Sequence, residues 1–135
     1  MDQVQLTFIP STLIARAGYP VQFHSSDEEL HNINVKNADT REQEFNVAIP
    51  PGQTFEHIFK NPGFYDVNCD IHPAMSAQIF VATSPYVVTA ERDGSFTFQD
   101  VVPGGYTLSV YAGTRRFDQP IQVTTGRNAV QIGNE

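Results

Sequence analysis

The sequence predicts an all-β protein, and two observations along the chain support this. No segment carries apolar residues at the i, i+3, i+4, i+7 spacing of an amphipathic helix. Short runs of β-branched and aromatic residues recur instead, and clusters of Gly, Pro, Asn and Asp separate them. Such runs are typical of a β-sandwich, and 135 residues suffice for one domain or for two very small ones.

The predicted strands fall into two sets. The first set covers residues 4–9, 20–24, 32–36, 45–48, 54–59, 63–68 and 76–82. The second set covers residues 86–91, 95–99, 106–112, 119–124 and 129–132. Turn residues mark the boundaries: Pro-Pro-Gly at 50–52 cannot continue a ladder, Asp93-Gly94 favours a tight hairpin, and Pro-Gly-Gly at 103–105 opens another turn.

Charge is spread unevenly along the chain. Residues 1–83 hold ten acidic and four basic side chains, whereas residues 84–135 hold five acidic and four basic ones. We therefore expect two domains, 1–83 and 84–135. The net charge of −7 argues against nucleic-acid binding, which needs a basic face, and favours a cationic partner. No run approaches the roughly 18 apolar residues of a membrane span, and the first residues lack a secretory signal, so we expect a soluble chain.

One short stretch concentrates the chemistry of the sequence. Cys69, the only cysteine, is followed by His72 and Met75, so thiolate, imidazole and thioether donors fall within seven residues at a predicted strand end. Soft sulfur donors select copper, and one Cys with two His and a weak axial Met is the blue-copper arrangement. His31, which opens a predicted strand after a polar loop, is the candidate for the second imidazole.

These residues resemble the cupredoxins, and most closely the amicyanin group, whose Cys-x2-His-x2-Met loop is matched by Cys69, His72 and Met75. The resemblance covers about residues 4–82 and includes the segments 18–23, 31–32, 51–59 and 62–65. It implies a Greek-key sandwich in which His31, Cys69, His72 and Met75 hold one type 1 copper ion. It also implies a carrier of single electrons that cycles Cu(II) and Cu(I), with a cytochrome or dehydrogenase as redox partner and a periplasmic or otherwise extracytoplasmic location.

Residues 84–135 carry a second resemblance, to the carboxypeptidase-regulatory, transthyretin-like sandwich. Asp93-Gly94-x-Phe96 and Pro103-Gly-Gly-Tyr106 match structural motifs of that family. No His, Cys or Met lies in this part of the chain, so we expect a β appendage without metal chemistry.

Catalysis is not expected. Copper enzymes of this fold place His beside the Cys to reach a second copper centre, whereas Asn68 and Asp70 flank Cys69 here. His24 and His57 are expected to be ordinary sheet histidines, and the acids at 27–29 an ordinary solvated loop. Two alternatives stay open: copper storage or delivery through the same ligands, and a plain adhesive β module with a dead site.

Three finer expectations concern the surroundings of the ligands. Ser25 and Asp70 should form a hydrogen bond that ties the two ligand loops together. The amide of Ile71, which stands where the resembling family has Pro, should donate a hydrogen bond to the Cys69 sulfur. Electrons should enter and leave through His72, beside the small apolar residues Pro73 and Ala74.

Overall fold

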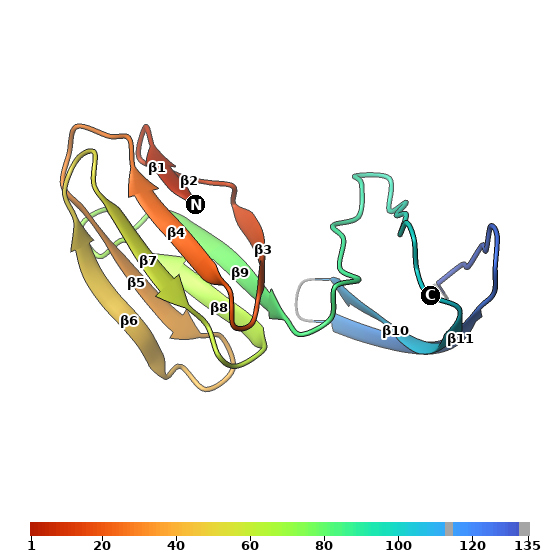
Figure 1. The fold of residues 1–135 in the computed structure, drawn as a ribbon. Coiled ribbons are helices and arrows are strands. Elements are labelled where there is room, and N and C mark those ends of the chain that lie inside the picture. The colour runs from red at the N-terminus through yellow and green to blue at the C-terminus, as the bar shows by residue number, and fades with distance from the viewer. Residues whose placement is uncertain (113–114, 133–135) are drawn as a thin grey trace. The chain divides into compact units, whose positions relative to one another are not determined.

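Figure 1 shows the fold of the chain as a computed structural model, which describes residues 1–112 and 115–132. The strands are β1 (Asp2–Val4), β2 (Thr7–Ile9), β3 (Thr12–Arg16), β4 (Pro20–Ser25), β5 (His31–Asn37), β6 (Gln43–Ile49), β7 (Thr54–Ile58), β8 (Gly63–Asn68), β9 (Ser76–Ala82), β10 (Gly104–Ala112) and β11 (Arg115–Val123). The all-β prediction is confirmed. Across these two described ranges, no helix has the length and apolar character needed to cross a membrane.

The chain divides into two compact units, Met1–Val87 and Val88–Glu135, and each is described by itself. Two sheets make up the first unit, with strand orders β2-β1-β4-β7 and β3-β9-β8-β5-β6 (Figure 1). Neighbouring strands pair antiparallel except β1 with β4 and β3 with β9, which are parallel. Because β2 and β3 follow each other in the chain but belong to different sheets, the N-terminal segment crosses from one sheet to the other.

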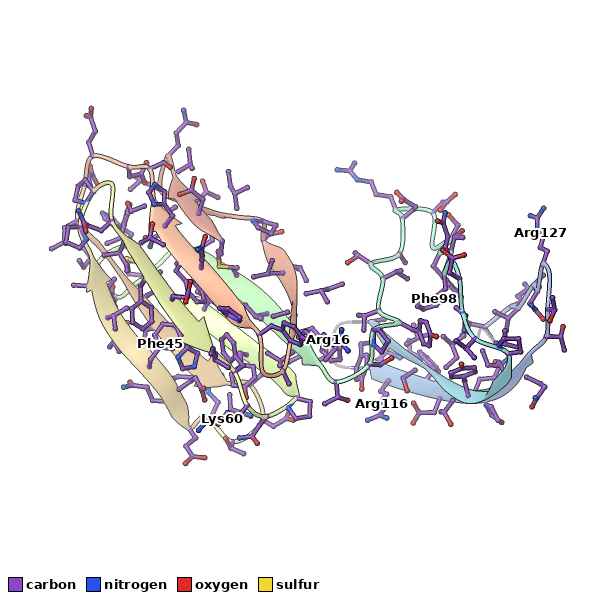
Figure 2. The ribbon with its side chains drawn as sticks, in the orientation of Figure 1. Arg16, Phe45, Lys60, Phe98, Arg116 and Arg127 are labelled. Carbon is purple, nitrogen blue, oxygen red and sulfur yellow. The ribbon has the colours of Figure 1, made fainter. Side chains whose placement is uncertain are left out.

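Side chains between the two sheets form a hydrophobic core. Val21 and Phe23 on β4, like Tyr65 and Val67 on β8, are buried at alternate positions, as a half-buried strand requires. Phe45, labelled in Figure 2, packs edge-on against Phe23 across the sandwich with ring centroids 5.4 Å apart. This alternation fixes the register, because a slip of one residue would turn each apolar set toward solvent.

The predicted strand 4–9 is wrong as a single strand, because the chain folds it into the hairpin of β1 and β2. Gln5 and Leu6 form the turn, with positive φ angles of 51° and 59°. Their amides donate hydrogen bonds to the two carboxylate oxygens of Asp27, at 2.5 and 3.0 Å. A side chain about twenty residues away thus satisfies the amides of a turn whose backbone conformation is uncommon outside glycine.

β3 was not among the predicted strands. It pairs parallel with β9, from Thr12 opposite Gln78 to Arg16 opposite Ala82. Leu13, Ile14 and Ala15 are contiguous apolar residues, so β3 lacks the alternation that marks a half-buried strand in a sequence. It lies at one edge of the five-stranded sheet.

In the second unit, one long hairpin of β10 and β11 forms, with paired residues from Gly104 opposite Val123 to Ala112 opposite Arg115. It includes the predicted strand at 106–112 and all but the last residue of the predicted strand at 119–124. The predicted strands at 86–91, 95–99 and 129–132 are wrong, because those residues adopt no strand pairing. Only the turn between the first two is formed, where the amide of Gly94 donates to the carbonyl of Glu91 at 2.9 Å. The residues Asp93 and Gly94 therefore form a turn, but the segments on either side of it do not pair as strands.

Candidate metal centre

The segment between β8 and β9 carries three of the four candidate ligands: Cys69, His72 and Met75. Two backbone hydrogen bonds close it into a tight loop. The amide of Met75 donates to the carbonyl of His72 at 2.9 Å, and the amide of Cys69 donates to the carbonyl of Met75 at 3.4 Å. These bonds turn the chain back on itself between Cys69 and Met75.

β5 brings the fourth candidate to the same end. β5 and β8 pair antiparallel, with Asn34 opposite Asn68. His31 opens β5, so it lies beyond the last paired residue of β8 and next to the loop that follows it. We call His31, Cys69, His72 and Met75 the donor cluster. The pairing of β5 with β8 brings His31 to residues almost forty positions later in the chain. Local sequence patterns do not predict which strands pair.

Three donor atoms of the cluster form a compact triangle. The Nδ1 atoms of His31 and His72 lie 3.1 Å apart, and the Sγ of Cys69 lies 3.8 Å from each. A point equidistant from these three atoms is about 2.1 Å from each, which matches the ~2.0–2.3 Å bonds that imidazole and thiolate make to a metal ion. Among the described residues, these three form the one group of His, Cys and acidic side chains whose ligand atoms all lie within 4.8 Å of one another.

Burial differs between the members of the donor cluster. His31 is fully buried, and Cys69 and Met75 are 1 % and 2 % exposed. The side chain of His72 is 26 % exposed, so it is the member that reaches the surface. Cys69 and Met75 both pack in the hydrophobic core, which excludes water from the sulfur side of the triangle.

Carboxylates occupy the outer nitrogens of both imidazoles. His31 Nε2 lies 2.7 Å from an Asp27 oxygen, and His72 Nε2 lies 3.1 Å from a Glu29 oxygen. A carboxylate that accepts a hydrogen bond from Nε2–H favours the tautomer in which the Nδ1 lone pair is free for a metal ion. In that tautomer the two Nδ1 lone pairs face each other 3.1 Å apart, and a cation between them would relieve their repulsion.

Asp27 is anchored on its other side by the turn of the β1–β2 hairpin. The hydrogen bond from the Leu6 amide is the main cause that lowers the pKa of Asp27, and the contacts with His31 and Gln5 act in the same direction. The expectation that acids 27–29 form an ordinary solvated loop is wrong for Asp27, whose side chain is only 13 % exposed against His31. Glu29 is exposed as expected, and it also contacts His72. One signal was present: Asp27 precedes His31 by four residues.

Asn32 and Asp70 join the two segments that carry the donor cluster. The Asp70 amide donates to Asn32 Oδ1 at 2.6 Å, and Asn32 Nδ2 donates to Asp70 Oδ2 at 2.9 Å. Asn34 and Asn46 donate to the same carboxylate, and the bond from Asn34 is the largest cause that lowers the pKa of Asp70. Sequence reasoning missed these three asparagines, because nothing local distinguishes them from other strand residues.

The expected bond between Ser25 and Asp70 is wrong. Ser25 is fully buried, its hydroxyl has no hydrogen-bond partner among the residues that the structure describes, and its amide donates to the carbonyl of Gln53 at 3.1 Å. Asp70 faces asparagines on the neighbouring strands instead, because the side chain of Asn32 already spans the distance between the two ligand segments.

The expected bond from the Ile71 amide to the Cys69 sulfur is also wrong. Among the described contacts of Cys69 Sγ, the polar neighbours are the two imidazoles and Asn32 Oδ1, which lies 3.3 Å away. Ile71 is half exposed, at 50 %. The loop thus turns this residue toward solvent.

The remaining two histidines lie away from the cluster. His24 Nδ1 is 2.8 Å from the hydroxyl of Thr54, and His57 Nε2 is 2.7 Å from Glu44. Both contacts join a strand to its neighbour or to the facing sheet, in line with the expectation that these are ordinary sheet histidines.

Comparisons with known proteins show a family for the first part of the chain. The family model for copper binding proteins of the plastocyanin/azurin family matches residues 1–82. Amicyanin from Paracoccus versutus is 20% identical, with a TM-score of 0.54 over 60% of this chain and 77% of that chain. A Cu-containing nitrite reductase from Thermus scotoductus SA-01 is 26% identical, with a TM-score of 0.54 over 60% of this chain and 21% of that chain.

A second family model matches the C-terminal part. It describes domain II of polysaccharide lyase family 4, and it covers residues 74–131, overlapping the first match at residues 74–82. This description differs from the carboxypeptidase-regulatory family that the sequence motifs resemble. The two stretches overlap at residues 84–131, which include the β10–β11 hairpin.

Proposed function

The chain belongs to the plastocyanin/azurin family of copper-binding proteins, and we propose that the donor cluster holds its one type 1 copper ion. The protein is a blue copper electron-transfer protein. When bound, the ion supplies one-electron chemistry between Cu(II) and Cu(I), and the protein provides the ligands, the shape of the site and the contact with redox partners. The triangle of three donor atoms is the observation that carries the assignment of ligands.

Each member of the donor cluster has a distinct part in this proposal. The Nδ1 atoms of His31 and His72 and the Sγ of Cys69 define the ligand plane. Met75, buried in the same loop, would provide a thioether as the fourth, weaker ligand. The set of thiolate, thioether and imidazoles is the one that favours copper over harder metals.

The surrounding contacts keep the ligands in place in both oxidation states. Carboxylates hold the two imidazoles from outside, and the pair of Asn32 and Asp70 fixes the start of the Cys69 loop against β5. Buried side chains held by several hydrogen bonds move little, so the reorganisation energy of electron transfer should be small.

His72 gives the proposed path for electrons. It is the partly exposed member of the donor cluster, and Ile71, Pro73 and Ala74 beside it are exposed. Leu30, 51 % exposed, precedes His31 on the neighbouring loop. Apolar residues around an exposed ligand suit a weak, transient contact with a partner such as a cytochrome or dehydrogenase, and the net charge of −7 favours a cationic one.

We propose a carrier and not an enzyme, acting outside the cytoplasm. Asn68 and Asp70 flank Cys69, so the route through a neighbouring histidine to a second copper centre is missing from this loop. We also propose that residues 1–83 form the copper domain and residues 84–135 a β appendage that takes no part in electron transfer.

Loading the purified apoprotein with Cu(II) tests this function. One equivalent should give the intense visible absorption of a thiolate–Cu(II) bond, with reversible one-electron voltammetry and slow loss of copper to a chelator. Cys69→Ser should abolish the colour, whereas Ser76→Ala, just outside the loop, should retain it. Rapid transfer of the copper to an apo-acceptor would favour copper delivery, and no stoichiometric binding would refute the proposal.

A further inference from the structure

Glu29 contacts the one member of the donor cluster that reaches the surface. Its carboxylate lies 3.1 Å from His72 Nε2, with the Glu29 side chain 62 % exposed and that of His72 26 % exposed. The buried imidazole, His31, has its own carboxylate in Asp27 at 2.7 Å. Both carboxylates come from the single loop between β4 and β5, two residues apart.

Several hydrogen bonds anchor this loop, so the approach of Glu29 to His72 is built into the fold. Asp27 accepts from the amides of Gln5 and Leu6. Ser26 donates from its amide to the carbonyl of Gln3 at 2.9 Å, and from its hydroxyl to Asp2 at 2.7 Å. These contacts hold the Ser26 backbone and the Asp27 side chain, so only a short segment separates the anchored residues from Glu29.

We propose that Glu29 is a positioning residue for His72 and lowers the reduction potential of the site, an inference that rests on the proposed function. By accepting a hydrogen bond from Nε2–H, Glu29 favours the His72 tautomer in which the Nδ1 lone pair points at the triangle. Its negative charge also favours the doubly charged ion over the singly charged one, because the attraction is proportional to the charge of the ion. Both effects act on the ligand through which electrons pass.

The opposing view treats the contact as a surface ion pair of no consequence, since exposed pairs contribute little to stability. Three variants separate the two views. Glu29→Gln retains an acceptor for Nε2–H and removes the charge, whereas Glu29→Ala removes both. Glu28→Gln removes the same charge one residue away, where the side chain is exposed and makes no described contact with His72. It is therefore the matched control.

Nitrogen NMR of the apoprotein, at a pH where imidazole is neutral, tests the positioning half without any metal. The wild type, Glu29→Gln and Glu28→Gln should all carry the His72 proton on Nε2. Glu29→Ala should give a mixture of His72 tautomers while His31, which keeps Asp27, is unchanged. An unchanged His72 tautomer in Glu29→Ala would overturn the proposal.

Voltammetry of the copper-loaded proteins tests the charge half. Glu29→Gln should change the ratio of Cu(II) to Cu(I) affinity by about tenfold, which raises the potential by about 59 mV for one electron. Glu28→Gln should give a clearly smaller rise, because its charge is farther from the imidazole. Equal rises in the two variants would overturn the proposal. A wild-type protein without blue absorption would instead refute the proposed function, and the apoprotein NMR would still decide the role of Glu29.

Discussion

Asn32 and Asp70 form a reciprocal pair: the Asp70 amide donates to Asn32 Oδ1 at 2.6 Å, and Asn32 Nδ2 donates back to Asp70 Oδ2 at 2.9 Å. Each residue directly follows a proposed copper ligand, His31 or Cys69. The pair therefore sets the separation between the ligand on β5 and the ligand after β8, two strands that the sequence keeps far apart.

Removing this pair should weaken copper binding. Asn32→Ala deletes both hydrogen bonds and lets the start of the Cys69 loop move, and contacts of this kind are worth about 10- to 100-fold in metal affinity. Competition against a chelator of known affinity measures the change. Asn46→Ala is the control, because it removes the 3.3 Å bond to Asp70 and the 2.9 Å bond that Asn46 Oδ1 accepts from Asn32, and leaves both bonds of the pair in place. Equal losses in both variants would show that the pair has no special part.

Truncating Ile71 should slow electron transfer and leave the copper site unchanged. Ile71 is 50 % exposed beside His72, so Ile71→Ser removes apolar contact area without touching a ligand. We expect electron self-exchange between the Cu(I) and Cu(II) proteins, measured by NMR line broadening, to fall by about tenfold, which corresponds to 1.4 kcal/mol.

The control for Ile71 is Ile58→Ser, which removes a similar side chain, 46 % exposed, at the end of β7. Its absorption spectrum and self-exchange rate should match those of the wild type. If Ile58→Ser slowed exchange as much as Ile71→Ser does, electrons would not pass at the His72 surface.

Phe59 should be essential for the stability of the first unit. It is fully buried and lies between the rings of His57 and Tyr65, each with its centroid 4.8 Å away. Phe59→Ala should lower the free energy of unfolding in urea by about 3–5 kcal/mol, because a cavity replaces the ring. Phe117→Ala, at a position 39 % exposed on the second unit, should cost about 1 kcal/mol or less. If Phe59→Ala lowered the free energy of unfolding by as little as Phe117→Ala does, Phe59 would not be part of a packed core.

The hairpin of the second unit should show a pH-dependent carboxyl at Asp118. The hydroxyl of Ser109 donates to Asp118 at 2.7 Å, and this bond, ahead of Arg116, lowers the pKa of Asp118 below 3.8. A lowered pKa stabilises the folded hairpin above pH 3.8, and this stabilisation disappears as the pH falls through the folded value.

Ser109→Ala should therefore raise the pKa of Asp118 toward 3.8 in an NMR titration of its carboxyl carbon. Asp93 provides an internal control, because Ser95, whose hydroxyl and amide donate to Asp93, lowers its pKa and is unchanged in this variant. A pKa of Asp118 that stays where it is in the wild type would contradict the assigned cause.

The sequence predicted the chemistry of the site better than its surroundings. Cys69, His72 and Met75 are close in the chain and carry rare donor types, so their spacing alone indicates a copper ligand loop. Asp27 and Glu29 gave no comparable signal, because an acidic residue in a polar loop has the same local pattern whether water or an imidazole binds it. Whether the carboxylate contacts water or an imidazole depends on the strand pairing that places the β4–β5 loop beside His72.

The fold shows the same division. Strands with alternating burial, such as β4 and β8, were predicted from their residues. The β1–β2 turn was missed because its stabilising contact with Asp27 comes from another part of the chain. In the second unit, strand-forming residues at 95–99 remain without a ladder, since a strand also needs a partner.

X-ray absorption at the copper edge of the Cu(II)-loaded protein tests the central claim most directly. We expect one copper per chain, bound by one short thiolate sulfur and two imidazole nitrogens, with the short thiolate contribution absent in Cys69→Ser. A copper ion surrounded only by nitrogen and oxygen ligands, or one whose short thiolate contribution persists in Cys69→Ser, would contradict the assignment of the donor cluster.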